Sequence, residues 1–286
     1  MRILQQVVFI ILLVLFLAAI PWVIHINPID KSIDWDFTRL GQIYKEFYQT
    51  LAGGGLGTYT IGSQIREISG DIPYNFTTSL IILLGGVIIA VIFSLLFGVF
   101  LSRFKLSRLI NILLNILSSI PDFILIVFGL IIAVKFYQIT GVRVLSLKVD
   151  GGALNLWFPI CLSSLAPTLY LFKLVAVKYY QISGEDYIRT AVSKGMDLNY
   201  INLHHVYKNI EPFIIAELTK IISLAVGNMF IIEYLLNVRG ITKFIFQSNQ
   251  FQPVAIGLFS MLLISLIVFL SVRIVLFMFK RGLVHE

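Results

Sequence analysis

The sequence predicts an all-α membrane protein with about six transmembrane helices, and its composition and hydropathy carry this prediction. Of the 286 residues, 58% are apolar and 13% are charged, and that charged share is about half that of an ordinary soluble domain. The mean hydropathy of +0.92 leaves too little polar surface to cover a globule in water. The apolar residues lie in continuous runs of about 20 or more, the length that crosses a hydrocarbon layer roughly 30 Å thick.

Six runs meet this length. They are approximately Leu4–Ile26, Ser79–Ser102, Leu109–Tyr137, Leu156–Val177, Phe213–Leu236 and Pro253–Phe279. We expect helices because the runs are continuous rather than alternating and are too long for strands. The first run is long for a secretory signal and no small-residue cleavage site follows it, so we expect a retained anchor.

The Lys and Arg residues of the short loops predict the orientation. Those beside the first, second and sixth runs fall on one side of a six-span chain: Arg2, Arg103, Lys105, Arg108, Lys280 and Arg281. Positively charged short loops face the cytoplasm, so both termini are expected there. The net charge of +7 is then mainly an orientation signal, and nucleic acid is not needed to explain it.

The orientation divides the chain into two parts. Residues 1–78 would form the first anchor helix and a long extracytoplasmic loop, and residues 79–286 would hold the other five spans. The loop is polar and rich in glycine around Gly53–Gly57, which predicts turns rather than a separately packed domain. Within it, Ile43–Leu51 could form a short interfacial helix.

The cytoplasmic segment between the fourth and fifth spans, residues 178–212, is punctuated for two helices. Ser183 lies three residues before Asp186, a plausible capping box that would start the first helix. Gly195 can take the left-handed conformation that ends a helix, and Asp197 can cap the next one.

The first of these helices is amphipathic. Its apolar residues recur at helical spacing: Ile188, Ala191, Val192 and Met196. A helix of this kind at a membrane surface either lies on lipid headgroups or docks another protein, and the periodicity alone leaves both open.

The residue string of this segment is more specific than its periodicity. It reads Asp186-Tyr187-Ile188-Arg189-Thr190-Ala191, then Lys194-Gly195-Met196, then His205, Asn209 and Pro212. This string resembles the signature loop of the permease subunits of binding-protein-dependent ABC importers, in the oligopeptide, dipeptide and nickel branch. In that family the loop forms a coupling helix that sits in a groove on the ATPase subunit. The resemblance implies these ATPase-coupling residues: Glu185, Asp186, Tyr187, Arg189, Thr190, Ala191, Lys194, Gly195, Met196, His205 and Asn209.

Four other segments are similar to the same family. They are Leu56-Gly57 in the first outer loop, Ser119-Ile120-Pro121 in the third span, Glu233 followed by Gly240-Ile241, and Pro253-Val254 at the entry to the last span. The resemblance therefore covers nearly the whole chain, and residues 79–286 would be the permease core with its coupling loop at residues 178–212.

The resemblance implies a multi-pass subunit of an ABC importer in the cell membrane that takes up oligopeptides or dipeptides, with nickel or a metal chelate as the alternative solute. The implied partners are a second homologous permease subunit, two cytoplasmic ATPase subunits and an extracytoplasmic solute-binding protein. No phosphate-binding G-x-x-x-x-G-K-[ST] motif occurs in the sequence. ATP and Mg are therefore expected on the partner subunits, with no cofactor and no enzymatic activity in this chain.

Catalytic and metal-binding residues are not predicted. The four histidines do not form H-E-x-x-H, and no G-x-S-x-G elbow is present. Ionisable residues within apolar runs are costly and suggest function, so Asp122 and Glu217, with Pro121 beside Asp122, are candidates for the translocation path. Structural roles are the alternative, including an i,i+3 ion pair between Glu217 and Lys220.

Two other functional classes stay open at this point. One is a secondary transporter or channel driven by an ion gradient, with Asp122 or Glu217 as the ion-linked acid. The other is a membrane-bound assembly subunit without a transport path. Four glycines in the spans predict close helix packing rather than solute contact: Gly85, Gly86, Gly98 and Gly227.

Overall fold

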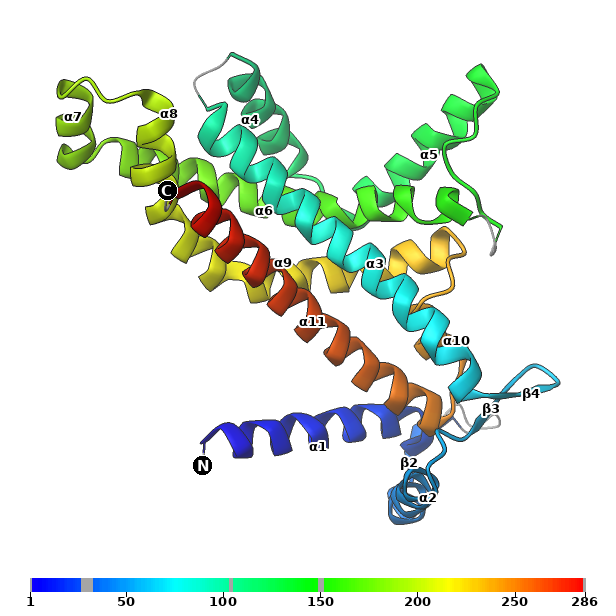
Figure 1. Ribbon diagram of the computed structural model, residues 1–286. Helices are drawn as coiled ribbons and strands as arrows, with labels where there is room; N and C mark the ends of the chain where they lie inside the picture. The colour runs from blue at the N-terminus through cyan, green and yellow to red at the C-terminus, as the bar shows by residue number, and fades with distance from the viewer. Residues whose placement is uncertain (1, 27–32, 103–104, 149–151, 285–286) are drawn as a thin grey trace. The chain divides into compact units, whose positions relative to one another are not determined.

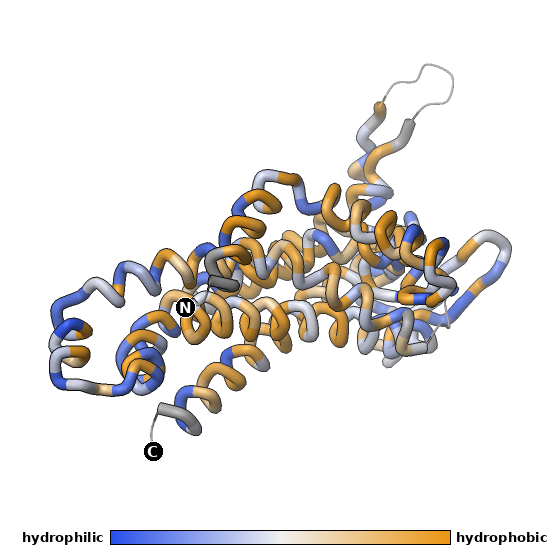
Figure 2. Tube along the Cα trace, turned by 90° about the horizontal axis from the view of Figure 1, so that it is seen from above, coloured by the Kyte–Doolittle hydropathy of each residue, from blue (hydrophilic) through white to orange (hydrophobic). Residues whose placement is uncertain are grey.

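The computed structural model describes residues 2–26, 33–102, 105–148 and 152–284, so the predicted inner charge at Arg103 lies outside the described residues. Six described helices are long and apolar enough to cross a membrane, which confirms the predicted number of spans. They are Leu4–Val23, Ile68–Phe100, Asp122–Thr140, Trp157–Ser183, Leu198–Leu235 and Phe251–Gly282. Figure 2 shows hydrophobic residues along the long helices and hydrophilic ones gathered in turns and at helix ends.

The chain forms two compact units, and the first comprises residues 1–79 and 239–264. Its helices are α1 (Arg2–Val23), α2 (Leu40–Ala52), the start of α3 (Ile68–Leu95), α10 (Ile241–Gln247) and the start of α11 (Phe251–Val284) (Figure 1). Two antiparallel hairpins complete it, one of β1 (Ile24–Ile26) with β2 (Ile33–Trp35) and one of β3 (Thr58–Ile61) with β4 (Gln64–Glu67). The short helix predicted in the outer segment is confirmed as α2, and the hairpins are elements that the sequence analysis does not predict.

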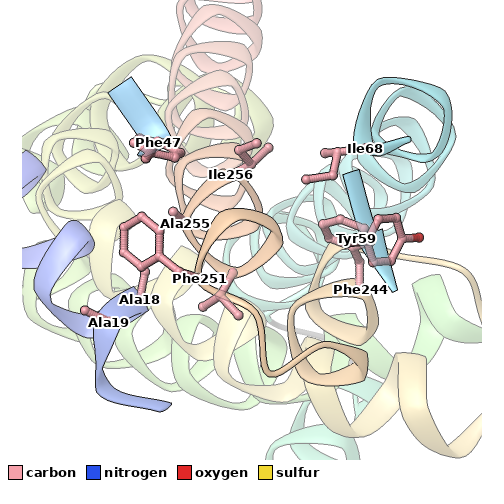
Figure 3. Close-up of a cluster of buried hydrophobic side chains, with 10 residues drawn as sticks. Ala18, Ala19, Phe47, Tyr59, Ile68, Phe244, Phe251, Ala255 and Ile256 are labelled. Carbon is pink, nitrogen blue, oxygen red and sulfur yellow. The ribbon is translucent and has the colours of Figure 1, made fainter. Parts of the chain in front are cut away.

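Aromatic and aliphatic side chains from separate elements form the core of this unit (Figure 3). The ring of Phe47 on α2 lies 5.4 Å from that of Phe251 on α11, and the ring of Tyr59 on β3 lies 5.2 Å from that of Phe244 on α10. The Tyr59 hydroxyl donates a hydrogen bond of 2.6 Å to Asp71. Burial, and then the Asp71 carboxylate, raise the pKa of Tyr59, so its hydroxyl stays protonated.

Gly57, in the segment that resembles the family's first outer loop, lies against the start of α11. Its φ is +84°, a left-handed conformation that favours glycine. A Cβ at this position would lie 2.3 Å from Nε2 of Gln252, and that amide donates a hydrogen bond of 3.0 Å to the carbonyl of Leu56. The backbone angle therefore favours glycine here, and a side chain at this position would also displace the Gln252 amide.

We expect Gly57→Ala to lower the stability of this unit by about 1–3 kcal/mol, because it adds backbone strain and displaces the Gln252 amide. Gly54→Ala is the matched control, since Gly54 also has a positive φ of +78° but a Cβ there meets nothing within 4 Å. The thermal unfolding midpoint of each variant in detergent measures the difference. Equal losses in the two variants would contradict the packing argument.

The second unit comprises residues 80–238 and 265–286. After the rest of α3 and the π-helical η1 (Leu96–Phe100), it contains α4 (Lys105–Leu117), α5 (Asp122–Thr140), the short 3-10 helix η2 (Gly152–Asn155) and α6 (Trp157–Ser183). The chain continues through α7 (Asp186–Ser193), α8 (Leu198–Ile201), the π-helical η3 (Asn202–Tyr207), α9 (Lys208–Leu235) and the rest of α11. Of the six spanning helices α6 is the most buried, and it packs against α9, η1, α4 and α5.

Glycines allow α3 to approach α6 closely. A Cβ at Gly86 would lie 2.0 Å from Oγ of Ser163, and one at Gly98 would lie 2.7 Å from the side chain of Val175. The Ser163 hydroxyl also donates a hydrogen bond of 3.1 Å to the carbonyl of Ile82. Close packing is thereby confirmed for Gly86 and Gly98, and also for Gly85, which faces Ile160. The prediction of close packing is wrong for Gly227, where a Cβ would meet no described atom within 4 Å.

The predicted third span, Leu109–Tyr137, is wrong as a single helix. The structure divides it at residues 118–121 into α4, which is too short to cross a membrane, and the spanning helix α5. Ser118 and Ser119 donate side-chain hydrogen bonds to the carbonyl of Asn115, which satisfies the end of α4. Pro121 is the residue before α5 and has an extended conformation, so it starts this helix rather than kinking one.

One end of the second unit gathers three chain segments. The ring of Phe279, near the C-terminal end of α11, lies 6.4 Å from that of Phe100 in η1 and 5.0 Å from that of Tyr207 in η3. The chain after α3, the segment of α7 and α8 and the C-terminal end of α11 therefore lie at the same end. The charge pattern groups the same three segments on one side, and that this side is the cytoplasm stays a prediction.

Candidate functional site

The candidate coupling segment consists of α7, α8 and η3, and it leads into the first turn of α9. The predicted capping box is wrong, because Ser183 is the last residue of α6 and its hydroxyl donates to the carbonyl of Tyr180 at 3.2 Å. Glu185 occupies the N-cap of α7 and makes no side-chain capping bond. The predicted cap of the second helix is confirmed, since the Asp197 carboxylate accepts a hydrogen bond of 2.9 Å from the amide of Asn199.

The C-terminal end of α7 forms a complete Schellman motif around Gly195. Gly195 has a φ of +75°, and its amide donates to the carbonyl of Val192 at 2.9 Å. The amide of Met196 donates to the carbonyl of Ala191 at 3.3 Å. These two bonds satisfy carbonyls that the end of a helix otherwise leaves unpaired. The structure thus confirms the predicted helix end and fixes the direction in which the chain leaves α7.

One face of α7 is packed within the segment. Ile188 and Ala191 are buried, and α7 contacts α6 and α8. Beside this contact lies a groove of about 310 Å³, and its lining comes from α6, α7, α8 and η3: Tyr179, Ser183, Ile188, Arg189, Val192, Ser193, Ile201, Asn202 and Val206. Because the Ala191 side chain is buried on the packed face, a partner that binds α7 contacts the exposed residues of this helix and not Ala191.

The opposite face of α7 is exposed and polar, with some apolar side chains. Arg189 and Asp186 form an ion pair of 3.6 Å, but their side chains are 73% and 98% exposed. An ion pair so exposed contributes little to stability, so both charges remain available to a partner. The other exposed residues predicted to couple are Glu185, Tyr187, Thr190, Lys194, Gly195, Met196 and, on α9, Asn209.

Tyr187 connects α7 to the first turn of α9. Nδ2 of Asn209 donates a hydrogen bond of 3.1 Å to the Tyr187 hydroxyl, and the ring of His205 lies 6.4 Å from the Tyr187 ring. Burial raises the pKa of Tyr187, as does the nearby charge of Glu185, so the hydroxyl stays protonated. The structure therefore brings Tyr187 close to His205 and Asn209, which follow it by 18 and 22 residues in the sequence.

The candidate path residues occupy different helices. Pro121 and Asp122 lie at the start of α5, where a negative charge is favoured by the helix dipole. Glu217 lies within α9, about 14 Å along the helix axis from its first residue at 1.5 Å per residue. A role for any of them in the path stays a prediction.

Glu217 and Lys220, both in the described part of the chain, do not form the direct ion pair that the sequence analysis offers as a structural alternative. Both side chains instead contact Tyr170 on α6. The Tyr170 hydroxyl donates a hydrogen bond to the Glu217 carboxylate, and the Lys220 ammonium lies 4.3 Å from the centre of the Tyr170 ring. The i,i+3 spacing allows a direct pair, but Tyr170 of the neighbouring α6 contacts both charged groups instead.

A largely buried ion pair between α9 and α11 is absent from the sequence-based expectations. Nζ of Lys280 on α11 lies 2.6 Å from the carboxylate of Glu211 on α9, and the two side chains are only 29% and 5% exposed. Removing one partner of a buried ion pair typically costs about 3–5 kcal/mol. The only signal in the sequence is an acid directly before Pro212 at the start of an apolar run, and it does not identify a partner 69 residues later.

Two comparisons with known proteins bear on this arrangement. A family model described as "Binding-protein-dependent transport system inner membrane component" matches residues 90–283, which is more than half of the chain. The oligopeptide transport system permease protein OppB of Mycoplasma pneumoniae is 28% identical over 233 residues, which cover 78% of this chain and 58% of that relative. This chain therefore spans less than two thirds of the relative's length. With six helices able to cross a membrane, the chain belongs to the family of binding-protein-dependent transport system inner membrane components.

Proposed function

We propose that the chain is a permease subunit of an ABC importer for oligopeptides, and that α7 couples it to ATP hydrolysis on partner subunits. Membership of the transport family and the similarity to an oligopeptide permease support the type of system. The observation that carries the coupling role is the exposed face of α7, which is held between a Schellman motif and a hydrogen bond to α9.

The proposed coupling uses the geometry of this segment. An ATPase subunit binds the exposed residues of α7, and ATP with its Mg is held by that subunit. When two ATPases close around ATP, they displace α7. The bond from Asn209 to Tyr187 and the contact of α7 with α6 pass the displacement to spanning helices. A second permease subunit completes the path, and an extracytoplasmic solute-binding protein delivers the solute.

An oligopeptide is the proposed solute because the relative's name specifies oligopeptide transport. Dipeptides and a nickel or metal chelate are solutes of the same branch and are the competing assignments. An ion-gradient-driven transporter would assign Asp122 or Glu217 as the ion-linked acid, and of these two the Glu217 carboxylate already accepts a hydrogen bond from Tyr170. The experiments below include these alternatives as outcomes.

Crosslinking tests the coupling role. Ser193 is an exposed position at the end of α7, whereas Ala191 is buried, so Ser193→Cys is the suitable probe. It is made in a Cys161→Ser background, which removes the natural cysteine. We expect a disulfide or short bifunctional crosslink to the co-expressed ATPase subunit. Thr140→Cys, exposed at the far end of α5 and predicted to be extracytoplasmic, is the matched control and should give no adduct.

A complex that copurifies with its ATPases but gives no adduct from Ser193→Cys would overturn the coupling role. The solute is tested separately by uptake of labelled penta- and tripeptides into proteoliposomes that contain the whole complex. Competition by nickel or its chelates but not by peptides would overturn the oligopeptide assignment. Uptake by this chain alone under a proton gradient would favour the secondary transporter.

A further inference from the structure

The first turn of α9 makes contacts in two directions. Asn209 donates to Tyr187 on α7, and Glu211 pairs with Lys280 on α11. Residues two apart on an α-helix are separated by about 200° around its axis, because each residue turns it by about 100°. The same turn therefore holds the coupling segment on one side and α11 on the other.

The contact of η3 and α9 with α11 includes an aromatic pair as well as the ion pair. Tyr207 lies four residues before Glu211, a spacing that places both side chains on one face of a helix. The Tyr207 side chain is fully buried, and its ring meets that of Phe279 at 5.0 Å, edge to face. Two adjacent residues of α11 thus contact two successive helical turns: Phe279 contacts Tyr207 in η3, and Lys280 contacts Glu211 in α9. Figure 1 shows the C-terminal end of α11 beside the segment of α8.

The ion pair fastens the start of α9 to the end of α11. A carboxylate with only 5% of its side chain exposed is costly without its partner, so α9 and α11 are held together wherever the first turn of α9 goes. Beside the pair lies a cavity of about 310 Å³, lined by Glu211, Phe277, Lys280 and Arg281. The cavity gives room for a longer basic side chain, which allows the charge to be kept while the side chain is changed.

We infer that Glu211 and Lys280 are positioning residues that make the end of α11 follow the coupling segment during transport. The inference rests on the proposed function. Displacement of α7 moves the first turn of α9 through Tyr187 and Asn209, and the ion pair with the Tyr207–Phe279 contact carries that displacement into α11. Without the ion pair, the ATPases would still close and still displace α7, but α11 would lag behind.

The expected result is a loss of coupling at constant assembly. In reconstituted complexes, Glu211→Gln and Lys280→Met should each lower the number of peptides taken up per ATP hydrolysed at least fivefold. The double variant Glu211→Lys with Lys280→Glu should restore this ratio to within twofold, and Lys280→Arg should keep it. Arg281→Gln is the matched control, since Arg281 is an exposed neighbour on the same helix and its loss should leave the ratio unchanged.

A distance measurement distinguishes positioning from simple stabilisation. Spin labels at the exposed positions Lys208 on α9 and Met278 on α11 report whether the two helices move together. The distance should be the same with and without ATP in the parent complex and should become ATP-dependent in Glu211→Gln. Should Glu211→Gln not assemble, Glu211→Asp gives the same test, because it keeps the charge and withdraws it from Lys280.

Two results would overturn the inference. One is an unchanged ratio of uptake to ATP hydrolysis in every single variant, with only the amount of complex reduced, which is the pattern of a purely structural ion pair. The other is a distance between α9 and α11 that does not respond to the loss of Glu211. If Ser193→Cys still crosslinks to the ATPase in these complexes, the proposed function survives and only the inference fails.

Discussion

Replacing Gly195 by valine is expected to abolish coupled transport, with uptake at least tenfold lower, while the protein still inserts and assembles. Gly195 has a φ of +75°, and a side chain with a branched Cβ resists this conformation by about 1–2 kcal/mol or more. Loss of the conformation breaks the bonds that Gly195 and Met196 donate to the last turn of α7. The measurement is peptide uptake together with ATP hydrolysis by the reconstituted complex.

The matched control separates the backbone from the side chain. A Cβ at position 195 meets nothing within 4 Å, so overlap of the Cβ with other parts of the fold does not account for the effect. Asparagine tolerates the left-handed region better than other non-glycine residues, and Gly195→Asn should therefore retain most of the uptake. Equal activity of the valine and asparagine variants would refute the role of the left-handed helix end.

The second large effect is expected in the contact between α3 and α6. Gly86→Val should destabilise the second unit by about 3 kcal/mol or more, because overpacking a tight contact costs about 1–3 kcal/mol and backbone atoms oppose its relief here. The new Cβ would lie 2.0 Å from Oγ of Ser163 and 3.2 Å from the Ser163 carbonyl carbon. The loss is measured as the detergent-solubilised fraction and its thermal midpoint.

Gly227→Val is the matched control for this prediction. It makes the same change in the interior of another spanning helix, where a Cβ meets nothing within 4 Å. The control should keep nearly the parent midpoint, so the difference between the variants reports packing rather than helix propensity. A smaller loss in Gly86→Val than in Gly227→Val would show that α3 and α6 do not approach each other as closely as described.

The number of spans and their approximate positions follow from the sequence because each depends on a local property. A run of about 20 apolar residues must satisfy its backbone within itself in a bilayer, so length and composition decide the structure. The end of α7 at Gly195 and the cap at Asp197 are equally local, since the bonds they make reach no further than five residues.

The errors arise where local patterns compete. Ser183 and Asp186 fit a capping box, yet Ser183 continues α6 and Glu185 becomes the cap, because an apolar helix extends further than its polar end suggests. The run around Pro121 is apolar enough for one helix, but serine hydroxyls and a proline end α4 there. Composition alone takes account of the apolar run and underestimates how serine hydroxyls and a proline end a helix.

Tertiary contacts account for what the sequence does not predict. The pair of Glu211 with Lys280, like the meeting of Glu217 and Lys220 at Tyr170, joins residues far apart in the chain. The coupling residues are predicted only through a resemblance, and their contacts show why the spacing matters. Tyr187 and Asn209 can bond because α7 folds back on the first turn of α9.

The length of α11 ties this protein to the thickness of its membrane. The helix runs without a break over 34 residues, about 51 Å at 1.5 Å per residue, whereas the hydrocarbon layer is about 30 Å thick. Its apolar surface exceeds that layer, and hydrophobic mismatch is relieved by tilting the helix or by stretching the lipid. A thinner bilayer therefore favours a greater tilt of this helix, within the limits that its packing against neighbouring helices allows.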